Sequence, residues 1–240
     1  GAAAGAAFQS ARADTGTLMA MARRTVWALA GLGLLFVAVQ GFAWHAVARG
    51  ALALTGEAEA LGRLAGSVTS NIAIFLHMIL GGVATILAVL QWAGPVRARW
   101  PRVHRVAGRV LAPLALLTGI GGLTYIGLRG TIGGWPMNVG FGLYGALMVA
   151  AAIQTPRLAR AGDYARHRRW GIRLIVLVLG SWIYRVHYGL LYGITCSMGE
   201  AYCGMGSRSD FGGPFDLVMN FAFYLPYLAL AEVWIRRAPP

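Results

Sequence analysis

A few ionisable side chains interrupt the longest apolar stretches of this sequence, and they are the residues best placed to do chemistry. His77 lies in one stretch, and Arg185 and His187 lie in another. At 1.5 Å per helical residue they would sit about 8–10 Å inside a membrane surface. A central Arg costs about 2.5–3.5 kcal/mol there, so each group needs a partner. We expect His77 and Arg185 to face a buried cavity that holds water or a ligand.

Two further polar residues, His45 and Asn220, would lie within about 5 Å of the same surface. Aromatic residues accompany them: Trp44, Trp182, Tyr184, Tyr188 and Tyr192. Two interpretations remain open for His45 and Asn220. They either line the cavity, or belong to an interfacial aromatic belt with satisfied or snorkelling polar groups.

A second set of cations opens two apolar stretches from the opposite side. His104–Arg105 precedes one stretch, and His167–Arg168 with Arg173 begins the other. Helix N-termini favour anions, because their backbone N–H groups are free and the helix dipole is positive there. The sequence predicts a site for a phosphate, a lipid head group or a propionate. Ordinary interfacial Arg is the alternative and accounts for most of these residues.

Inward-facing His pairs in a helical bundle can hold haem b. His77 could pair with His187 near one surface, and His104 with His167 near the other, as ligands of two haem irons in transmembrane electron transfer. Propionates would be neutralised by Arg105, Arg173 or Arg185. His104 and His167 lie in first helical turns, which is shallow for axial ligands. We take this as the first hypothesis because a visible spectrum tests it.

Two non-enzymatic functions remain open beside haem binding. A cavity lined by Gln, Tyr, His and Arg suits a quinone, an anionic lipid or a small anion, as in a binding or carrier protein. An Arg-rich face could also dock an accessory subunit onto a larger membrane complex. An enzyme is the weakest hypothesis, since the sequence has no paired carboxylates or phosphate-binding Gly loop. Zinc or copper at His77 and His187 would lack a third ligand.

Composition places these residues in a membrane. Of 240 residues, 58% are hydrophobic and 12% are charged, whereas soluble domains have about 45–50% and about 25%. The formal charge of +13 does not indicate nucleic acid, because all 21 basic residues are Arg in short blocks between apolar runs.

Six apolar runs approach or exceed the ~20 residues of a helical span. They are too continuous for barrel strands, so the predicted fold is an all-α integral membrane protein. The runs are Val26–Ala48, Asn71–Ala93, Val110–Leu128, Met137–Gln154, Gly171–Tyr192 and Leu217–Ile235. We expect residues 1–20 to be a disordered extension and residues 21–240 to form a single transmembrane domain.

Arginine placement predicts the orientation of these spans. Residues 97–109 and 157–169 each carry five Arg, whereas the loops on the other side carry few. The positive-inside rule then puts both termini in the cytoplasm, in a bacterial inner membrane. Cys196 and Cys203 fall in the fifth loop, on the predicted outer side. We predict a disulfide between them in an oxidising periplasm, with two free thiols as the alternative.

An offset of 63 residues aligns part of the chain with itself. In the eighteen positions from 91 to 108, six identities pair Gln91, Arg97, Ala98, His104, Arg105 and Gly108 with Gln154, Arg160, Ala161, His167, Arg168 and Gly171. Shared composition is the alternative, although Gln and His are rarer here. We predict two parallel helical hairpins, about residues 71–128 and 137–192, that form a core bundle of spans two to five. Spans one and six would be more peripheral.

The polar and small residues of this core also form an ordered pattern. It comprises His77, Gly81–Gly82, Gln91, Arg99, His104–Arg105, Gly108–Arg109, His167, Trp170, Arg173 and Arg185. Over about residues 70–190 this pattern resembles the bacterial membrane family catalogued as domain of unknown function 2306. The resemblance implies a multi-spanning membrane protein and supplies no settled activity. His45, His187 and the two Cys lie outside the pattern.

Overall fold

The computed structural model describes residues 31, 33–53 and 68–237, and every structural statement below refers to these. Contacts divide the chain into two units, residues 1–38 and 39–240. In the first unit, the described residues are helical and begin the first span, Gly33–Ala53. The predicted extension over residues 1–20 lies outside the described residues. The remainder of the description concerns the second unit.

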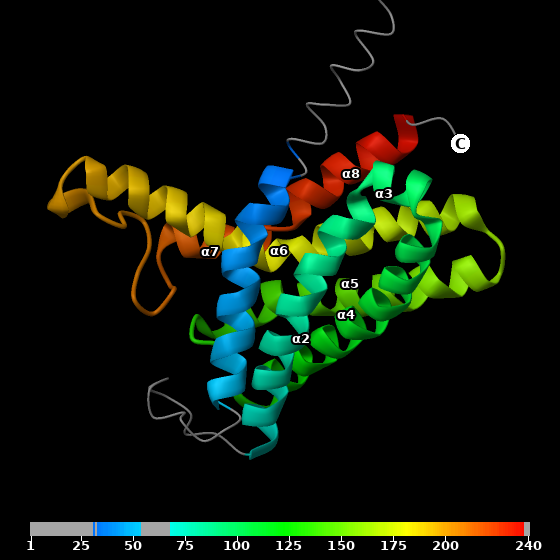
Figure 1. Ribbon diagram of the computed structural model, residues 1–240. Coiled ribbons are helices and arrows are strands. Elements are labelled where there is room, and N and C mark those ends of the chain that lie inside the picture. Colours follow the sequence, from blue (N-terminus) through cyan, green and yellow to red (C-terminus); the bar gives the residue numbers. More distant parts are fainter. Residues whose placement is uncertain (1–30, 32, 54–67, 238–240) are drawn as a thin grey trace, which may run out of the picture. The chain divides into compact units, whose positions relative to one another are not determined.

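The described part of the chain is almost entirely helical and contains no strand (Figure 1). Six helices in it are long and apolar enough to cross a membrane, which confirms the predicted all-α fold with six spans. After the first span, the elements are α2 (Val68–Trp92), α3 (Gly94–Arg99), α4 (Pro101–Arg129), α5 (Gly134–Arg160), α6 (Tyr164–Ser197), the 3₁₀ turn η2 (Glu200–Tyr202), α7 (Pro214–Ala222) and α8 (Leu225–Arg237).

Four long helices pack around one core. Helix α2 packs on α4, α4 on α5, α5 on α6, and α6 returns to α2. Prolines begin several of these elements, since Pro lacks the N–H that a first helical turn leaves free. Pro95, Pro101 and Pro214 occupy such positions in α3, α4 and α7. As a result α4 begins nine residues before the predicted span at Val110, and His104 lies in its first turn.

The sixth span is not the continuous helix that the sequence predicts. It stops at Ala222 and resumes at Leu225, with Phe223 and Tyr224 in a turn between α7 and α8. Pro226 explains the interruption, because its ring has no N–H to donate and would clash with the carbonyl of Ala222 four residues earlier. The turn is closed by bonds from Tyr224 N–H to the Phe221 carbonyl and from Leu228 N–H to the Tyr224 carbonyl.

The turn that interrupts span six is packed in the core, although α7 and α8 contact the bundle less extensively than α2, α4, α5 and α6 contact one another. Phe223 and Tyr224 are fully buried, and their rings contact Tyr144 of α5 at centroid distances of 4.9 and 5.3 Å. Close approach depends on Gly140, where an added Cβ would lie 2.9 Å from the Cβ of Asn220. A small residue at this crossing lets α7 dock on α5 and bring the aromatic turn inward.

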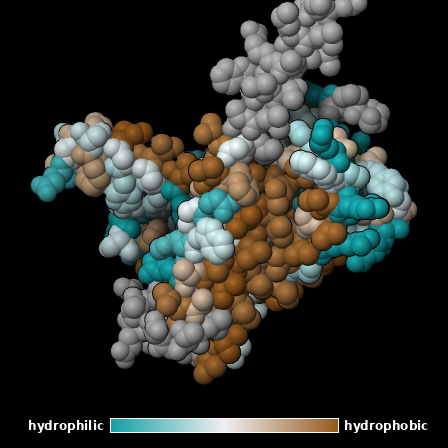
Figure 2. Space-filling view, in the orientation of Figure 1, coloured by the Kyte–Doolittle hydropathy of each residue, from teal (hydrophilic) through white to brown (hydrophobic). Residues whose placement is uncertain are grey.

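The surface of the described helices is suited to lipid. In Figure 2, hydrophobic side chains cover the middle of the face shown, and hydrophilic ones gather at the left and at the right, the right being where α5 ends and α6 begins in Figure 1. We call residues 97–109 and 157–173 the arginine-rich end. There, Trp92 of α2 stacks on Trp234 of α8 at 6.2 Å, and the guanidinium of Arg168 lies 5.1 Å from the centre of the Trp234 ring. These contacts join α2, α6 and α8 at that end.

Candidate functional site: an intramembrane cavity

A cavity of about 390 Å³ lies among the first span, α2, α4, α5 and α6. His77 of α2 and Arg185 of α6 both line it, as the cost of placing them in lipid led us to expect. The complete lining comprises Phe42, His45, Ala46, Arg49, His77, Met78, Gly81, Gly82, Ala84, Thr85, Ala115, Thr118, Tyr144, Met148, Val178, Ser181 and Arg185. Cations and imidazoles therefore share one space with a largely apolar wall.

The imidazole of His77 is held in one orientation. Its Nδ1 lies 2.8 Å from the backbone carbonyl oxygen of Thr118 in α4. A carbonyl can only accept, so Nδ1 carries the proton and donates. Gly122 makes room for the ring, since a Cβ there would lie 3.0 Å from Nδ1. Nε2 is left to accept a bond when the ring is neutral, or to donate one when the ring is charged.

Arg185 carries the charge that most needs a partner. Its Nη1 donates to the carbonyl oxygen of Ser181 at 2.8 Å and to the Ser181 Oγ at 3.0 Å. Its guanidinium carbon lies 4.7 Å from the centre of the Phe42 ring, a cation–π contact. Among the described residues, no carboxylate lies within ion-pair distance of it. The guanidinium is neutralised by no side chain there and keeps donors to spare.

The first span contributes a second pair of polar groups to the cavity. His45 and Arg49 both line it, and Arg49 Nη1 lies 3.5 Å from His45 Nε2. The sequence left His45 open between a cavity and an interfacial belt; in the structure it lines the cavity and is exposed. Arg49 was expected in a loop beyond the predicted end of the span at Ala48, but the helix continues to Ala53.

Most of the remaining wall is apolar or internally satisfied, although the buried Thr118 hydroxyl has no hydrogen-bond partner among the described residues. Met78, Met148 and Val178 present aliphatic surface. The hydroxyl of Tyr144 donates to the Leu177 carbonyl, and that of Thr85 donates to the Gly81 carbonyl. Because both hydroxyls already have hydrogen-bond partners, Tyr144 and Thr85 present mainly carbon atoms to the cavity. The cavity is positive where His77, Arg185 and the first span meet it, and hydrophobic elsewhere.

His187 does not join His77. Its Nε2 lies 3.1 Å from the Tyr227 hydroxyl of α8, and it is not among the residues that line the cavity. Two residues along a helix rotate the side chain by about 200°, so His187 and Arg185 point in nearly opposite directions. The pairing of His77 with His187 that the haem hypothesis uses is therefore not assembled.

The two histidines predicted at the opposite end differ in their side-chain contacts: His167 has a hydrogen-bond partner, whereas the Nδ1 of His104 has none among the described residues. His104 and His167 are each the fourth residue of their helix, α4 and α6, and are close enough to interact electrostatically. His167 Nδ1 lies 2.9 Å from the Thr155 carbonyl oxygen, whereas Gln91 Nε2 donates to the backbone oxygen of His104 at 2.9 Å. The two positions aligned by the repeat thus use different bonds. Neither His lines the cavity.

Arg173 is not free to neutralise a propionate, because it pairs with Glu232 of α8. Its guanidinium also lies 4.8 Å from the centre of the Trp170 ring. Glu232 is the one acidic residue within the six apolar runs of the sequence, but nothing in the sequence indicates that it pairs with Arg173. Arg105 is exposed at the arginine-rich end and does not line the cavity.

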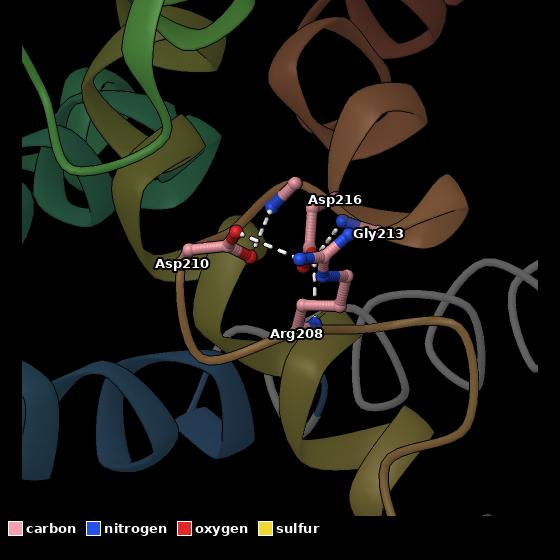
Figure 3. Close-up of polar contacts among 5 residues, drawn as sticks. Arg208, Asp210, Gly213 and Asp216 are labelled. Atoms are coloured by element: carbon pink, nitrogen blue, oxygen red, sulfur yellow. Dashed lines mark hydrogen bonds and ion pairs between the residues drawn. The ribbon is translucent and has the colours of Figure 1, made fainter.

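The loop that follows α6 is anchored by a disulfide and by one buried carboxylate. Cys196 and Cys203 are bonded to each other. Asp216, which is fully buried, accepts from Tyr188 and Ser207 hydroxyls at 2.7 Å and from the backbone N–H groups of Arg208 and Gly213. Figure 3 shows this carboxylate beside the exposed pair of Arg208 and Asp210. The loop is tied to α6 and α7 near their ends.

Over the described residues, no group of three or more His, Cys, Asp or Glu side chains is arranged to hold a metal ion. No curated protein and no solved structure matches the chain. The sequence model of one family does match, over residues 74–235, which is more than half of the chain and extends beyond the expected 70–190 to include the broken sixth span. The chain therefore belongs to the family described as "Predicted membrane protein (DUF2306)".

Proposed function

We propose that this protein binds an amphipathic anion inside the membrane, in the cavity between His77 and Arg185. The observation that carries the proposal is Arg185, a cation within a spanning helix that lines a cavity and has no carboxylate partner among the described residues. An unpaired guanidinium in a bilayer is costly, and an anionic ligand removes that cost. Charge-assisted bonds from Arg to a carboxylate or phosphate are among the strongest available.

The two sides of the cavity suit the two parts of such a ligand. The head group would accept bonds from Arg185 and, when its ring is protonated, from His77 Nε2. The tail would lie along Met78, Met148 and Val178, which line the same cavity. The 390 Å³ volume falls within the range of small-molecule sites, about 300–1,000 Å³. Binding or carriage without chemistry is the simplest use of these groups.

A fluorescent fatty acid tests the proposal in protein purified in a neutral maltoside detergent. We expect saturable binding that Arg185→Gln weakens about tenfold or more, since hydrogen bonds to charged groups contribute about 1.5–3 kcal/mol. Arg208→Gln is the matched control, because its side chain pairs with Asp210 at an exposed site. Equal affinity in the wild type and in Arg185→Gln would remove the basis of the proposal.

His77 favours a second candidate of different chemistry. With Nδ1 committed to Thr118, Nε2 is oriented as a ligand for a haem iron or as a partner for a quinone oxygen. A visible spectrum of the purified protein, together with analysis of its lipid extract, distinguishes haem binding from quinone binding. A Soret band that shifts on reduction and is lost in His77→Ala supports haem b and electron transfer, whereas quinone in the lipid extract of a colourless preparation supports a quinone site.

For the orientation, we propose that the arginine-rich end faces the cytoplasm of a bacterial inner membrane, with both termini on that side. The clustering of Arg at the joined ends of α2, α6 and α8 supports it through the positive-inside rule. A reporter enzyme that works only in the cytoplasm should be active when it is fused after Arg237. Activity of a reporter that works only in the periplasm, fused at the same position, would contradict this orientation.

A further inference from the structure

One side of the cavity is formed by a single stripe of the first span. Phe42, His45, Ala46 and Arg49 follow the i, i+3, i+4, i+7 spacing that places residues on one helical face. Two glycines bring this helix close to α2. A Cβ at Gly82 would lie 2.9 Å from the Val47 side chain, and one at Gly50 would lie 2.9 Å from the Phe75 carbonyl oxygen. The stripe is therefore held against the cavity by close backbone contact.

This stripe doubles the cationic charge of the site. Arg49 and Arg185 reach the cavity from different helices, and each is permanently charged. Among the described residues neither has a carboxylate partner, and no Asp or Glu lines the cavity. Within residues 31, 33–53 and 68–237, the only side-chain hydrogen bond to Arg49 is the long contact with His45 Nε2, which leaves most of its donors available there. A monoanionic ligand would leave one guanidinium without a counter-charge.

We infer that the ligand is a phosphate monoester with an apolar tail, selected over a carboxylate by Arg49. A phosphate monoester carries a charge of about −1.5 to −2 at pH 7 and presents three acceptor oxygens. Its charge therefore balances the charges of two guanidinium groups, whereas the single charge of a carboxylate balances only one. The inference rests on the proposed function, since it assigns the ligand class of the same cavity.

Arg49, the residue proposed to select the phosphate, lies outside the part of the chain that the family model matches. That match begins at residue 74, whereas the stripe ends at Arg49. His77 and Arg185, in contrast, lie within it. The matched part of the chain thus supplies the first cation of the site, and the first span, which precedes the match, supplies the second.

Displacement of the fluorescent fatty acid from the full-length protein tests the inference. The competitors are lysophosphatidate, a single-chain phosphate monoester; an unlabelled fatty acid of equal chain length; lysophosphatidylcholine, which is zwitterionic; and inorganic phosphate. We expect lysophosphatidate to displace the probe at about tenfold lower concentration than the fatty acid, and the other two not to compete. Arg49→Gln should abolish this tenfold advantage, so that lysophosphatidate and the fatty acid displace the probe at equal concentrations.

Matched variants keep the result interpretable. Arg49→Lys retains the charge and should keep most of the advantage, and Arg236→Gln removes an exposed Arg remote in sequence from the stripe and should have no effect. Equal potency of the two anions, or an advantage that persists in Arg49→Gln, overturns the inference while the proposed function stands. If inorganic phosphate displaced the probe at the same concentration as lysophosphatidate, the inference that the ligand has an apolar tail would be wrong. Loss of all probe binding in the wild type would contradict the proposed function itself.

Discussion

The Nδ1 atom of His77 lies 2.8 Å from the backbone carbonyl oxygen of Thr118, and this contact decides which edge of the ring is available to a ligand. The bond joins α2 to α4 and fixes the proton on Nδ1. Because His77 lines the cavity, Nε2 is the ring nitrogen left for a head group, a quinone oxygen or an iron. The packing of two helices thus sets the chemistry of the site.

Gly122→Ala should weaken ligand binding without unfolding the protein. The added Cβ would lie 3.0 Å from His77 Nδ1 and 3.2 Å from Cε1, so the ring must shift and its bond to Thr118 lengthen. We expect the affinity for the fluorescent fatty acid to fall several-fold. Gly127→Ala in the same helix has nothing within 4 Å of the new Cβ and should bind like the wild type. Unchanged affinity in Gly122→Ala would show that the ring position is unimportant.

His77 and His187, the two histidines predicted to lie about 8–10 Å inside the outer surface, should differ in their effect on binding. His77→Ala removes a residue of the cavity and should weaken binding of the probe about tenfold. His187→Ala removes a partner of Tyr227 outside the cavity and should leave the dissociation constant unchanged. Titration of both variants measures this. An equal loss in His187→Ala would contradict the placement of its side chain.

Gly140→Ala should destabilise the protein, because the new Cβ would lie 2.9 Å from the Asn220 Cβ and 3.0 Å from its carbonyl carbon. Overpacking of this kind costs about 1–3 kcal/mol, which lowers the melting temperature by several degrees at about 2–4 °C per kcal/mol. Gly142→Ala, two residues away, meets nothing within 4 Å and should be neutral or stabilising. Thermal unfolding in detergent compares them. Identical melting temperatures would argue against the close docking of α7 on α5.

Asp216→Asn should loosen the loop between α6 and α7. An Asn amide has a single acceptor oxygen, so either the backbone N–H groups of Arg208 and Gly213 or the hydroxyls of Tyr188 and Ser207 lose the oxygen to which they now donate. Leaving such buried donors without an acceptor costs about 1–3 kcal/mol. We expect faster proteolysis within residues 198–213. Asp210→Asn, which breaks only an exposed ion pair, is the control and should be cleaved at the wild-type rate.

Arg173 and Glu232 should behave as a coupled pair. Each single change, Arg173→Gln or Glu232→Gln, leaves one partly buried charge without its partner. The double variant leaves none, so its melting temperature should lie closer to the wild type than that of either single variant. Additive losses in the double variant would mean that the two side chains do not depend on each other.

Sequence reasoning recovered the parts of this structure that lipid imposes. Long apolar runs with few charges predict spanning helices, and all six are present among the described helices. The cost of an intramembrane cation predicted a cavity shared by Arg185 and His77. The sequence does not predict side-chain directions that depend on how the helices pack. His187 turns to Tyr227, and Arg173 turns to Glu232, because α8 lies against α6.

Two features of the site carried a sequence signal that was not used. The spacing of Phe42, His45, Ala46 and Arg49 marks one helical face, but Arg49 was placed beyond the end of the first span. Pro226 within the sixth apolar run signalled the break at Phe223–Tyr224. The Thr118 carbonyl that orients His77 carried no signal, since any residue type supplies a backbone oxygen. The two-hairpin repeat and the orientation remain predictions.

An experimental structure of the protein in lipid nanodiscs, determined with lysophosphatidate present, tests the central claim most directly. The account predicts head-group density in the cavity, within hydrogen-bonding distance of the Arg185 guanidinium and of His77 Nε2, with the tail along Met78 and Met148. A cavity without such density, or an Arg185 side chain turned to the acyl chains of the surrounding lipid, would contradict it.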